Sequence, residues 1–95
     1  MKFAYLIMGG FRSAEDHAAI HGGQAQIVGV DDLQEACAVA KKLRSEGVDC
    51  IELCGAFGPD GARAVMDATE HKLPIGYVTH LPEMDAVYQA AFSRS

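Results

Sequence analysis

Basic residues are scarce in this chain of 95 residues, and no dense basic cluster occurs. Eight lysines and arginines stand against 13 acidic residues, which gives a formal net charge of −5. The densest basic segment, Lys41-Lys42-Leu43-Arg44, has the pattern of one solvated helix face. Nucleic-acid binding needs concentrated positive charge, so the composition argues against a nucleic-acid partner.

The chain also lacks a hydrophobic run of the roughly 20 residues that span a bilayer. The apolar run of residues 3–8 is short, and Gly9 and Gly10 follow it instead of a signal-peptide cleavage region. We therefore expect no membrane association and a cytoplasmic location. No internal repeat, low-complexity tract or linker interrupts the sequence, so we expect a single α/β domain over residues 1–95.

Cysteine is too rare for a disulfide framework. The three cysteines, Cys37, Cys50 and Cys54, form an odd set that suits reduced thiols. On a strand, Cys50 and Cys54 would lie roughly 13 Å apart, too far to share a metal ion. The glycine-rich segment 55–61 is neither a Walker loop nor a dinucleotide fingerprint. We therefore predict no resident metal and no cofactor.

Apolar runs alternate with helical patterns along the chain. We expect strands at residues 3–8, 24–30, 48–56 and 74–80. Helices are expected after Asp31 or Asp32, from Pro59, and from Pro82. Residues 13–21 suit either a short helix with Ser13 as its N-cap or an ordered loop.

This order predicts an α/β fold with a small open, mostly parallel four-stranded sheet in βαβαβα order. The alternative is a ferredoxin-like α+β sheet that forms a dimer, which follows if residues 11–24 are not a crossover. Because a chain of this size buries a modest core, we expect a homo-oligomer.

Ligands of parallel α/β sheets bind where the strands end. Three of the four expected strand ends carry glycine or a reactive group, whereas the opposite ends carry ordinary turn residues. Backbone N–H groups of the segment 55–61 could hold a carboxylate or phosphate at a helix start, although the glycines could also serve only to turn the chain. The candidate ligand-binding residues are Gly9, Gly10, Phe11, Gly55, Phe57, Gly58, Gly61 and Tyr77.

Four side chains could transfer protons or act as nucleophiles. His80 ends the last strand, and its alternative role is to cap the following helix. Glu52 lies in mid-strand, where a carboxylate must be paired or hydrogen-bonded, or else serve as a catalytic acid or base. Cys54 ends a strand beside a helix start, a setting typical of reactive thiols, yet cysteine is also a common core residue. His21 is the fourth candidate, and it could pair with His17 on a metal if that segment is helical.

Several segments resemble a family of short bacterial proteins classed as a domain of unknown function. They are Met8-Gly9-x-Phe11, Ile20-His21-Gly22-Gly23, Ile27-Val28-Gly29-Val30, the run from Glu46 to Gly58, and Gly76-Tyr77-Val78-x-His80. This resemblance covers nearly the whole chain and implies no activity. The segment Glu52-Leu53-Cys54-Gly55 is also similar to strand ends of some TIM barrels, including the copper-homeostasis barrel family, which implies a parallel βα unit.

Together these features predict a protein that binds a small polar or anionic metabolite at the strand carboxyl ends. Acid–base catalysis by an isomerase, lyase or hydrolase would suit His80 and Glu52. The alternatives are a non-catalytic ligand- or metal-binding accessory module and a structural subunit of an oligomer. The residues do not specify the substrate or the reaction.

Overall fold

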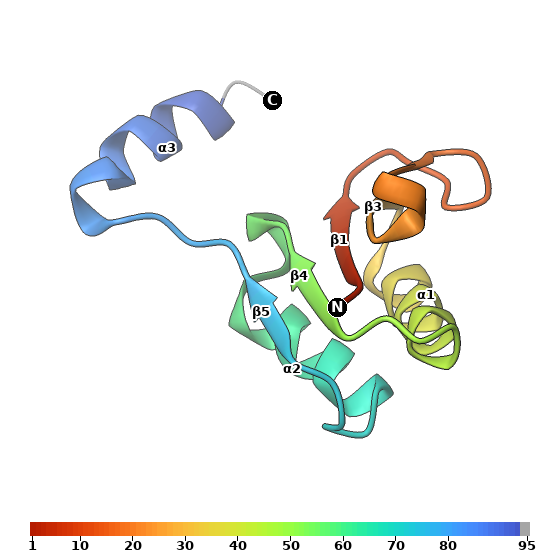
Figure 1. Cartoon of the computed structure of the whole chain (residues 1–95). Helices are drawn as coiled ribbons and strands as arrows, with labels where there is room; N and C mark the ends of the chain where they lie inside the picture. The colour runs from red at the N-terminus through yellow and green to blue at the C-terminus, as the bar shows by residue number, and fades with distance from the viewer. Residues whose placement is uncertain (94–95) are drawn as a thin grey trace.

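The computed structural model describes residues 1–93, and within them five strands form one open sheet in the order β2-β3-β1-β4-β5. Two α-helices pack against this sheet, and a third stands apart from it (Figure 1). The strands are β1 (Phe3–Met8), β2 (His17–Ile20), β3 (Ala25–Val30), β4 (Cys50–Leu53) and β5 (Ile75–Tyr77). The α-helices are α1 (Leu33–Ser45), α2 (Gly58–Ala68) and α3 (Asp85–Phe92).

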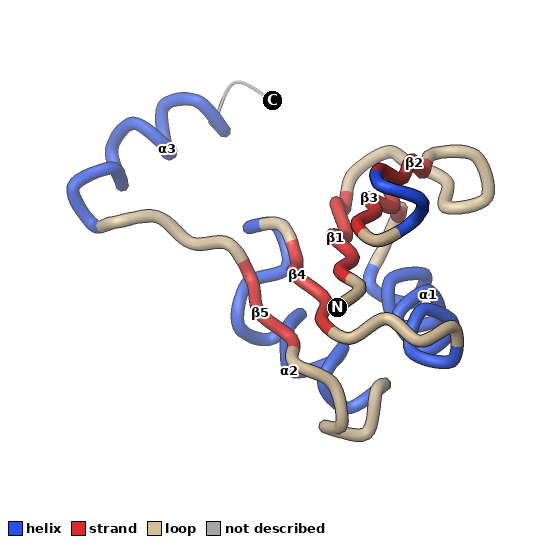
Figure 2. The backbone as a smooth tube through the Cα atoms, in the orientation of Figure 1, coloured by secondary structure: helices blue, strands red, loops and turns tan. Residues whose placement is uncertain are grey.

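The sheet is mixed but mostly parallel, which confirms the α/β class. Strands β3, β1, β4 and β5 run parallel, and β2 pairs antiparallel with β3 at one edge of the sheet. Figure 2 shows β2 beside β3. The expected four-strand sheet is therefore short by one strand. The ferredoxin-like alternative does not describe this topology.

The fifth strand lies where a short helix was one of two expectations. The Arg12 N–H donates to the Asp16 carboxylate at 2.7 Å, and the Asp16 carbonyl accepts from the Gly29 N–H at 2.8 Å. These bonds lay the following residues along the otherwise unpaired edge of β3. Gly22 and Gly23, with φ of 64° and 93°, then return the chain into β3. Residues 17–20 form a strand because they pair with β3, so the prediction of a short helix over residues 13–21 was wrong.

Helices α1 and α2 cover one face of the sheet. The Asp32 carboxylate caps α1 by accepting from the Glu35 N–H at 2.8 Å, and Gly47 follows the helix with φ of 92°. The two helices touch through the Cys37 thiol, which donates to the Ala64 carbonyl at 3.7 Å. The largest fully buried side chains, from the sheet and from α2, are Leu6, Val30, Ile51, Leu53, Val65 and Thr69.

No described helix covers the other face of the sheet, which we term the open face. Strand alternation and register assign residues to it. On β1 the alternation is sharp, because Leu6 under the helices is 0% exposed and Phe3 on the open face is 44% exposed. The open face comprises Phe3, Tyr5, Ile7, Ala18, Ile20, Ala25, Ile27, Gly29, Cys50, Glu52 and Gly76.

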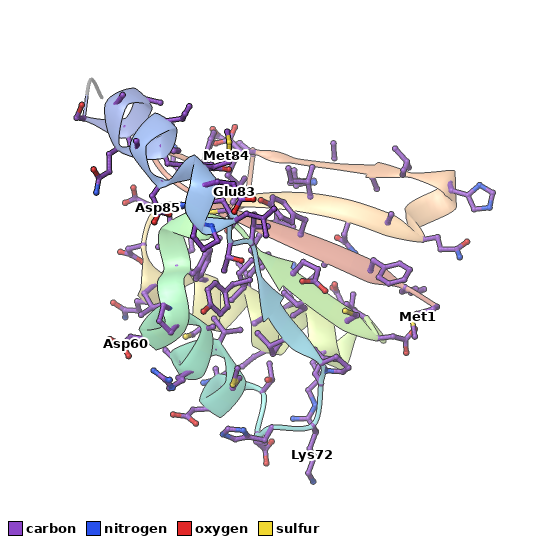
Figure 3. All side chains as sticks on the ribbon, turned by 90° about the vertical axis from the view of Figure 1, so that its left-hand side faces the viewer. Met1, Asp60, Lys72, Glu83, Met84 and Asp85 are labelled. Atoms are coloured by element: carbon purple, nitrogen blue, oxygen red, sulfur yellow. The ribbon has the colours of Figure 1, made fainter. Side chains whose placement is uncertain are left out.

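After β5 the chain leaves the body as a C-terminal arm, residues 78–93. Every residue of this arm is exposed. A 3-10 turn (Pro82–Met84) leads into α3, which stands clear of the body in Figure 1. In Figure 3 the end of this turn and the start of α3, marked by Glu83, Met84 and Asp85, lie at the opposite end of the strands from Met1. Among residues 1–93 no helix has the length and apolar character needed to cross a membrane.

Candidate functional site

The parallel strands β1, β4 and β5 end at the same edge of the sheet, and hydrogen bonds align their ends. The Cys54 N–H donates to the Leu6 carbonyl at 3.0 Å, and the Val78 N–H donates to the Leu53 carbonyl at 2.8 Å. Gly55 lies against the end of β5, because a Cβ placed on it would be 3.4 Å from the Val78 carbonyl oxygen. The residues after β1 and β4 therefore meet where the parallel strands end, which we term the carboxyl edge. Ligands of α/β proteins bind at this end of the strands.

Phe11 closes the end of the open face at this edge. A Cβ on Gly29 would lie 2.6 Å from the Phe11 Cβ, and one on Gly9 would lie 3.0 Å from Phe11 Cε2. The ring therefore packs directly on the backbone of β3 and beside Gly9, whereas Gly10 faces open space. Sequence reasoning missed Gly29, although a glycine inside an apolar strand often marks such a close approach.

The other expected ligand-binding residues divide into core and surface. Phe57 is 5% exposed and packs against Gly61, on which a Cβ would lie 3.1 Å from the Phe57 Cβ. Tyr77 is half-buried and also packs against the core. These three residues support the fold. Gly55 and Gly58 remain at the surface, and a Cβ on Gly58 would meet nothing within 4 Å.

Gly58 also begins α2, with φ of 62°. No side chain among residues 1–93 caps this helix start, and Pro59 occupies its first turn. The first N–H groups of a helix have no partner within the helix, so those of α2 are left to water or to a ligand. The charged side chain nearest to this helix start in sequence is that of Asp60, which pairs with Arg63 at 2.9 Å and is fully exposed.

Cys54 lies beneath this edge. Its thiol is part of the buried core, with 9% of the residue exposed. The sulfur accepts a hydrogen bond from the Met8 N–H at 3.3 Å. The bond ties the end of β1 to the end of β4, so the arrangement supports the structural role that the sequence left open for Cys54.

Glu52 points from β4 onto the open face. Its carboxylate accepts from the Cys50 thiol at 3.5 Å and extends over Gly76, where any larger residue would collide with it. Tyr5 is its cross-strand neighbour. Burial, followed by the hydrogen bond and the charge of Glu52, raises the pKa of Cys50. Burial, followed by the effect of Cys54, raises the pKa of Tyr5. The carboxylate therefore sits beside two groups that keep their protons at neutral pH.

His80 lies at the root of the arm. Its Nε2 is 2.7 Å from the Asp85 carboxylate, and its ring stacks on Tyr88 with 3.8 Å between ring centroids and 12° between planes. The His80 side chain is 31% exposed. The carboxylate and the stacked ring thus fix the orientation of an accessible imidazole. Asp85 was missed in the sequence, although an acid in the first turn of a helix just after a histidine was visible there.

The structure does not bring all four proton-transfer candidates together. Glu52 pairs with Gly76, and His80 follows Gly76 by four positions, a path of roughly 13 Å for an extended chain. His21 lies in the turn between β2 and β3. The strand β2 is one outer strand of the sheet, and β5, which leads to His80, is the other. His17 is in a strand, so the helical histidine pair does not form. Residues 1–93 contain no group of three or more histidine, cysteine or acidic side chains suited to a metal ion.

Two shallow grooves lie elsewhere on the body. One, of about 670 Å³, runs between α1 and α2, and its lining includes Lys41, Arg44 and Glu70. The other, of about 570 Å³, lies between α1 and the segment before β2, and its lining includes His17 and Lys42. Neither includes a residue of the carboxyl edge, so neither corresponds to the expected site.

Comparison with known proteins places the chain in a family. The sequence profile described as "Family of unknown function (DUF6506)" matches residues 1–93, so the chain belongs to this family. No curated protein and no solved structure matches the chain. The family assignment confirms the resemblance seen in the sequence and supplies no activity.

Proposed function

We propose that this protein binds a small polar or anionic metabolite at the carboxyl edge of its sheet and transfers a proton to or from it through His80. One observation carries the proposal: the 2.7 Å contact between His80 and Asp85, together with the stacked Tyr88 ring. An imidazole held at one nitrogen by a carboxylate can exchange a proton at the other nitrogen near neutral pH.

The remaining edge residues provide places for polar groups of a metabolite. The N–H groups at the start of α2 suit a carboxylate or phosphate, because they are uncapped and the helix dipole favours an anion there. Glu52 suits a hydrogen-bond donor of the ligand on the open face. The chemistry proposed is that of an isomerase, lyase or hydrolase in a reducing, cytoplasmic compartment, where the three free cysteines would persist.

A thermal-shift screen tests binding. The probes are inorganic phosphate, pyruvate, malate, citrate and a sugar phosphate, each added to the full chain. A compound that binds the native state raises the melting temperature. We expect at least one probe to do so, and we expect His80→Gln to abolish the rise. His71→Gln is the matched control, because His71 also contacts an aspartate at 2.7 Å, on α2.

A second pair of variants locates the anion. Gly22→Ala is the control for Gly58→Ala, because both glycines have positive φ and neither Cβ would meet an atom within 4 Å. The backbone cost is larger at Gly58, whose φ of 62° and ψ of −177° are almost exclusive to glycine, than at Gly22, whose φ of 64° and ψ of 24° are left-handed helical. The melting temperature of each variant is therefore measured first without probe, and the response is taken as the rise above that value. We expect only Gly58→Ala to lose the ligand response. Equal loss in both variants, or no stabilising probe at all, would reject the binding proposal.

Catalysis is tested separately from binding. The stabilising compound is incubated in D₂O with the protein, and deuterium uptake at its carbon atoms is followed by NMR. Exchange that is lost in His80→Gln supports proton transfer. Binding without exchange or turnover would show a non-catalytic binding module instead.

A further inference from the structure

The C-terminal arm and the open face are two apolar surfaces that stay uncovered within one chain. Helix α3 has eight residues, and isolated helices shorter than roughly 12–15 residues are marginal in water. None of its residues is buried. A surface packed against its apolar side would therefore stabilise it.

The arm has the pattern of a helix that packs on an apolar surface. Met84, Val87, Tyr88 and Ala91 recur at helical spacing and make one stripe. The first three are 42%, 57% and 37% exposed. The opposite side of the helix carries Asp85 and Gln89. An amphipathic helix with no surface beneath its apolar stripe lacks a partner.

The open face is an apolar surface with no helix packed on it. Phe3, Ile20 and Ile27 are 44%, 70% and 41% exposed on it, and Glu52 is the only charged residue that the strand register assigns to it. Sheets in α/β proteins are normally covered on both faces. A contiguous apolar face of this kind marks an interaction surface.

We propose that two copies of this chain exchange their arms, so that α3 of each copy packs on the open face of the other. The direction of the arm favours a second copy over its own sheet. The arm runs away from the body in Figure 1, and Leu81 is extended within it, with φ of −69° and ψ of 148°, as a residue before proline prefers. The stack of His80 on Tyr88 fastens this extended segment to α3. Folding back would require a reversal within residues 79–81.

The area involved suits a stable dimer. Leu81, Met84, Val87 and Tyr88 are between 37% and 66% exposed. Taking the roughly 200 Å² of a large aromatic side chain as an upper figure for each, four half-exposed side chains present at most roughly 400 Å² per arm. Two arms and the two sheet areas they cover then remove at most roughly 1,600 Å² from water, within the range of stable specific interfaces. Exchange of an identical element is a reciprocal contact that closes at two copies.

The exchange would also provide a hydrogen-bond donor for the Glu52 carboxylate. A carboxylate that becomes covered needs hydrogen-bond donors. Cys50 already supplies one, and the Tyr88 hydroxyl lies within the stripe that would cover the face. The site would then combine Glu52 of one chain with His80 and Tyr88 of the partner subunit. The dimer itself does not depend on any ligand, so it is tested without one.

Sedimentation equilibrium of the full chain, from 1 to 200 μM, tests the exchange. We expect a dimer for the unmodified protein and for Gln89→Glu, and a monomer for Val87→Glu. These two variants add the same charge to α3, one on each side of the helix. Val87 is 57% exposed in the single chain, so its substitution should leave the fold intact, as far-UV circular dichroism will report. Ile27→Glu, on the open face, should also yield a monomer.

Each other result overturns the proposal. An unmodified chain that stays monomeric at 200 μM has no exchanged arm. A dimer that survives Val87→Glu uses another surface. Larger species that grow with concentration would show open, non-reciprocal contacts. A dimer that survives Ile27→Glu but not Val87→Glu would place the arm somewhere other than the open face.

Discussion

Leu6 and Phe3 lie on the same strand, three residues apart, and experience opposite environments. Leu6 is fully enclosed beneath α1 and α2, whereas Phe3 is 44% exposed on the face that no described helix covers. The side chains on both faces of this strand are apolar, as in a strand that is covered on both sides. The difference teaches that apolar character shows which surfaces need covering and does not show which segment, or which molecule, covers them.

The largest expected effect contrasts the two faces directly. Leu6→Ala should lower the free energy of unfolding by about 2–5 kcal/mol, as for other fully buried leucines, because it leaves a cavity under the helices. Ile27→Ala should cost less than half as much, because Ile27 is already 41% exposed. Urea denaturation measures both substitutions in the Val87→Glu background, which is expected to be monomeric. Equal losses in that background would contradict the exposure of the open face.

The next effect concerns the end of the open face. Gly29→Ala should destabilise by roughly 1–3 kcal/mol, because its Cβ would lie 2.6 Å from that of Phe11 and force the ring away. Gly10→Ala, whose Cβ would meet nothing within 4 Å, is the control. In the double variant with Phe11→Ala, the cost of Gly29→Ala should largely vanish. Additive losses in that cycle would rule out the Phe11 contact as the cause.

A smaller effect depends on pH. The pKa values of Cys50 and Tyr5 are raised in the folded chain, so above pH 9 the unfolded chain loses these protons first. Stability is then fully present below the unfolded pKa values and falls as the pH rises through the folded ones. Urea midpoints between pH 7.5 and 10.5 should therefore decline, and less steeply in Cys50→Ala. An identical slope in that variant would remove Cys50 from the explanation.

The smallest effect is a shift in thiol reactivity. Glu52→Gln removes the negative charge that helps to raise the pKa of Cys50, so alkylation of Cys50 by iodoacetamide should begin at a lower pH. Cys37, whose pKa is raised chiefly by burial between α1 and α2, is an internal control and should keep its profile. Mass spectrometry distinguishes the two sites. Parallel shifts at both cysteines would indicate a general loosening of the fold.

Some elements followed from short stretches of sequence. The start of α1 was evident because the Asp32 carboxylate accepts from the Glu35 N–H, and Gly47 marked its end with a left-handed residue. The Glu35 carboxylate accepts from the Ser13 N–H instead of returning a bond to Asp32. Proline positions likewise indicated the helices after Pro59 and Pro82. These signals act within one or two turns of chain, so no tertiary information is required to read them.

Other features depended on distant segments. Strand β2 exists because the edge of β3 was available to pair with it. His80 was expected to lie with Glu52 and Cys54, yet the arm holds it against Asp85 and Tyr88. Cys54 was read from its place beside a helix start, and its hydrogen bond to Met8, 46 residues away, required the folded sheet.

Periodicity, capping residues and turn glycines are local properties, and they were sufficient to specify an alternating α/β chain with mostly parallel strands. Which apolar surfaces meet is a property of all segments at once, because burial is non-directional and each surface competes for every other. The assembled sheet therefore decided that one face lies beneath α1 and α2, that the other stays open, and that α3 stands apart from both.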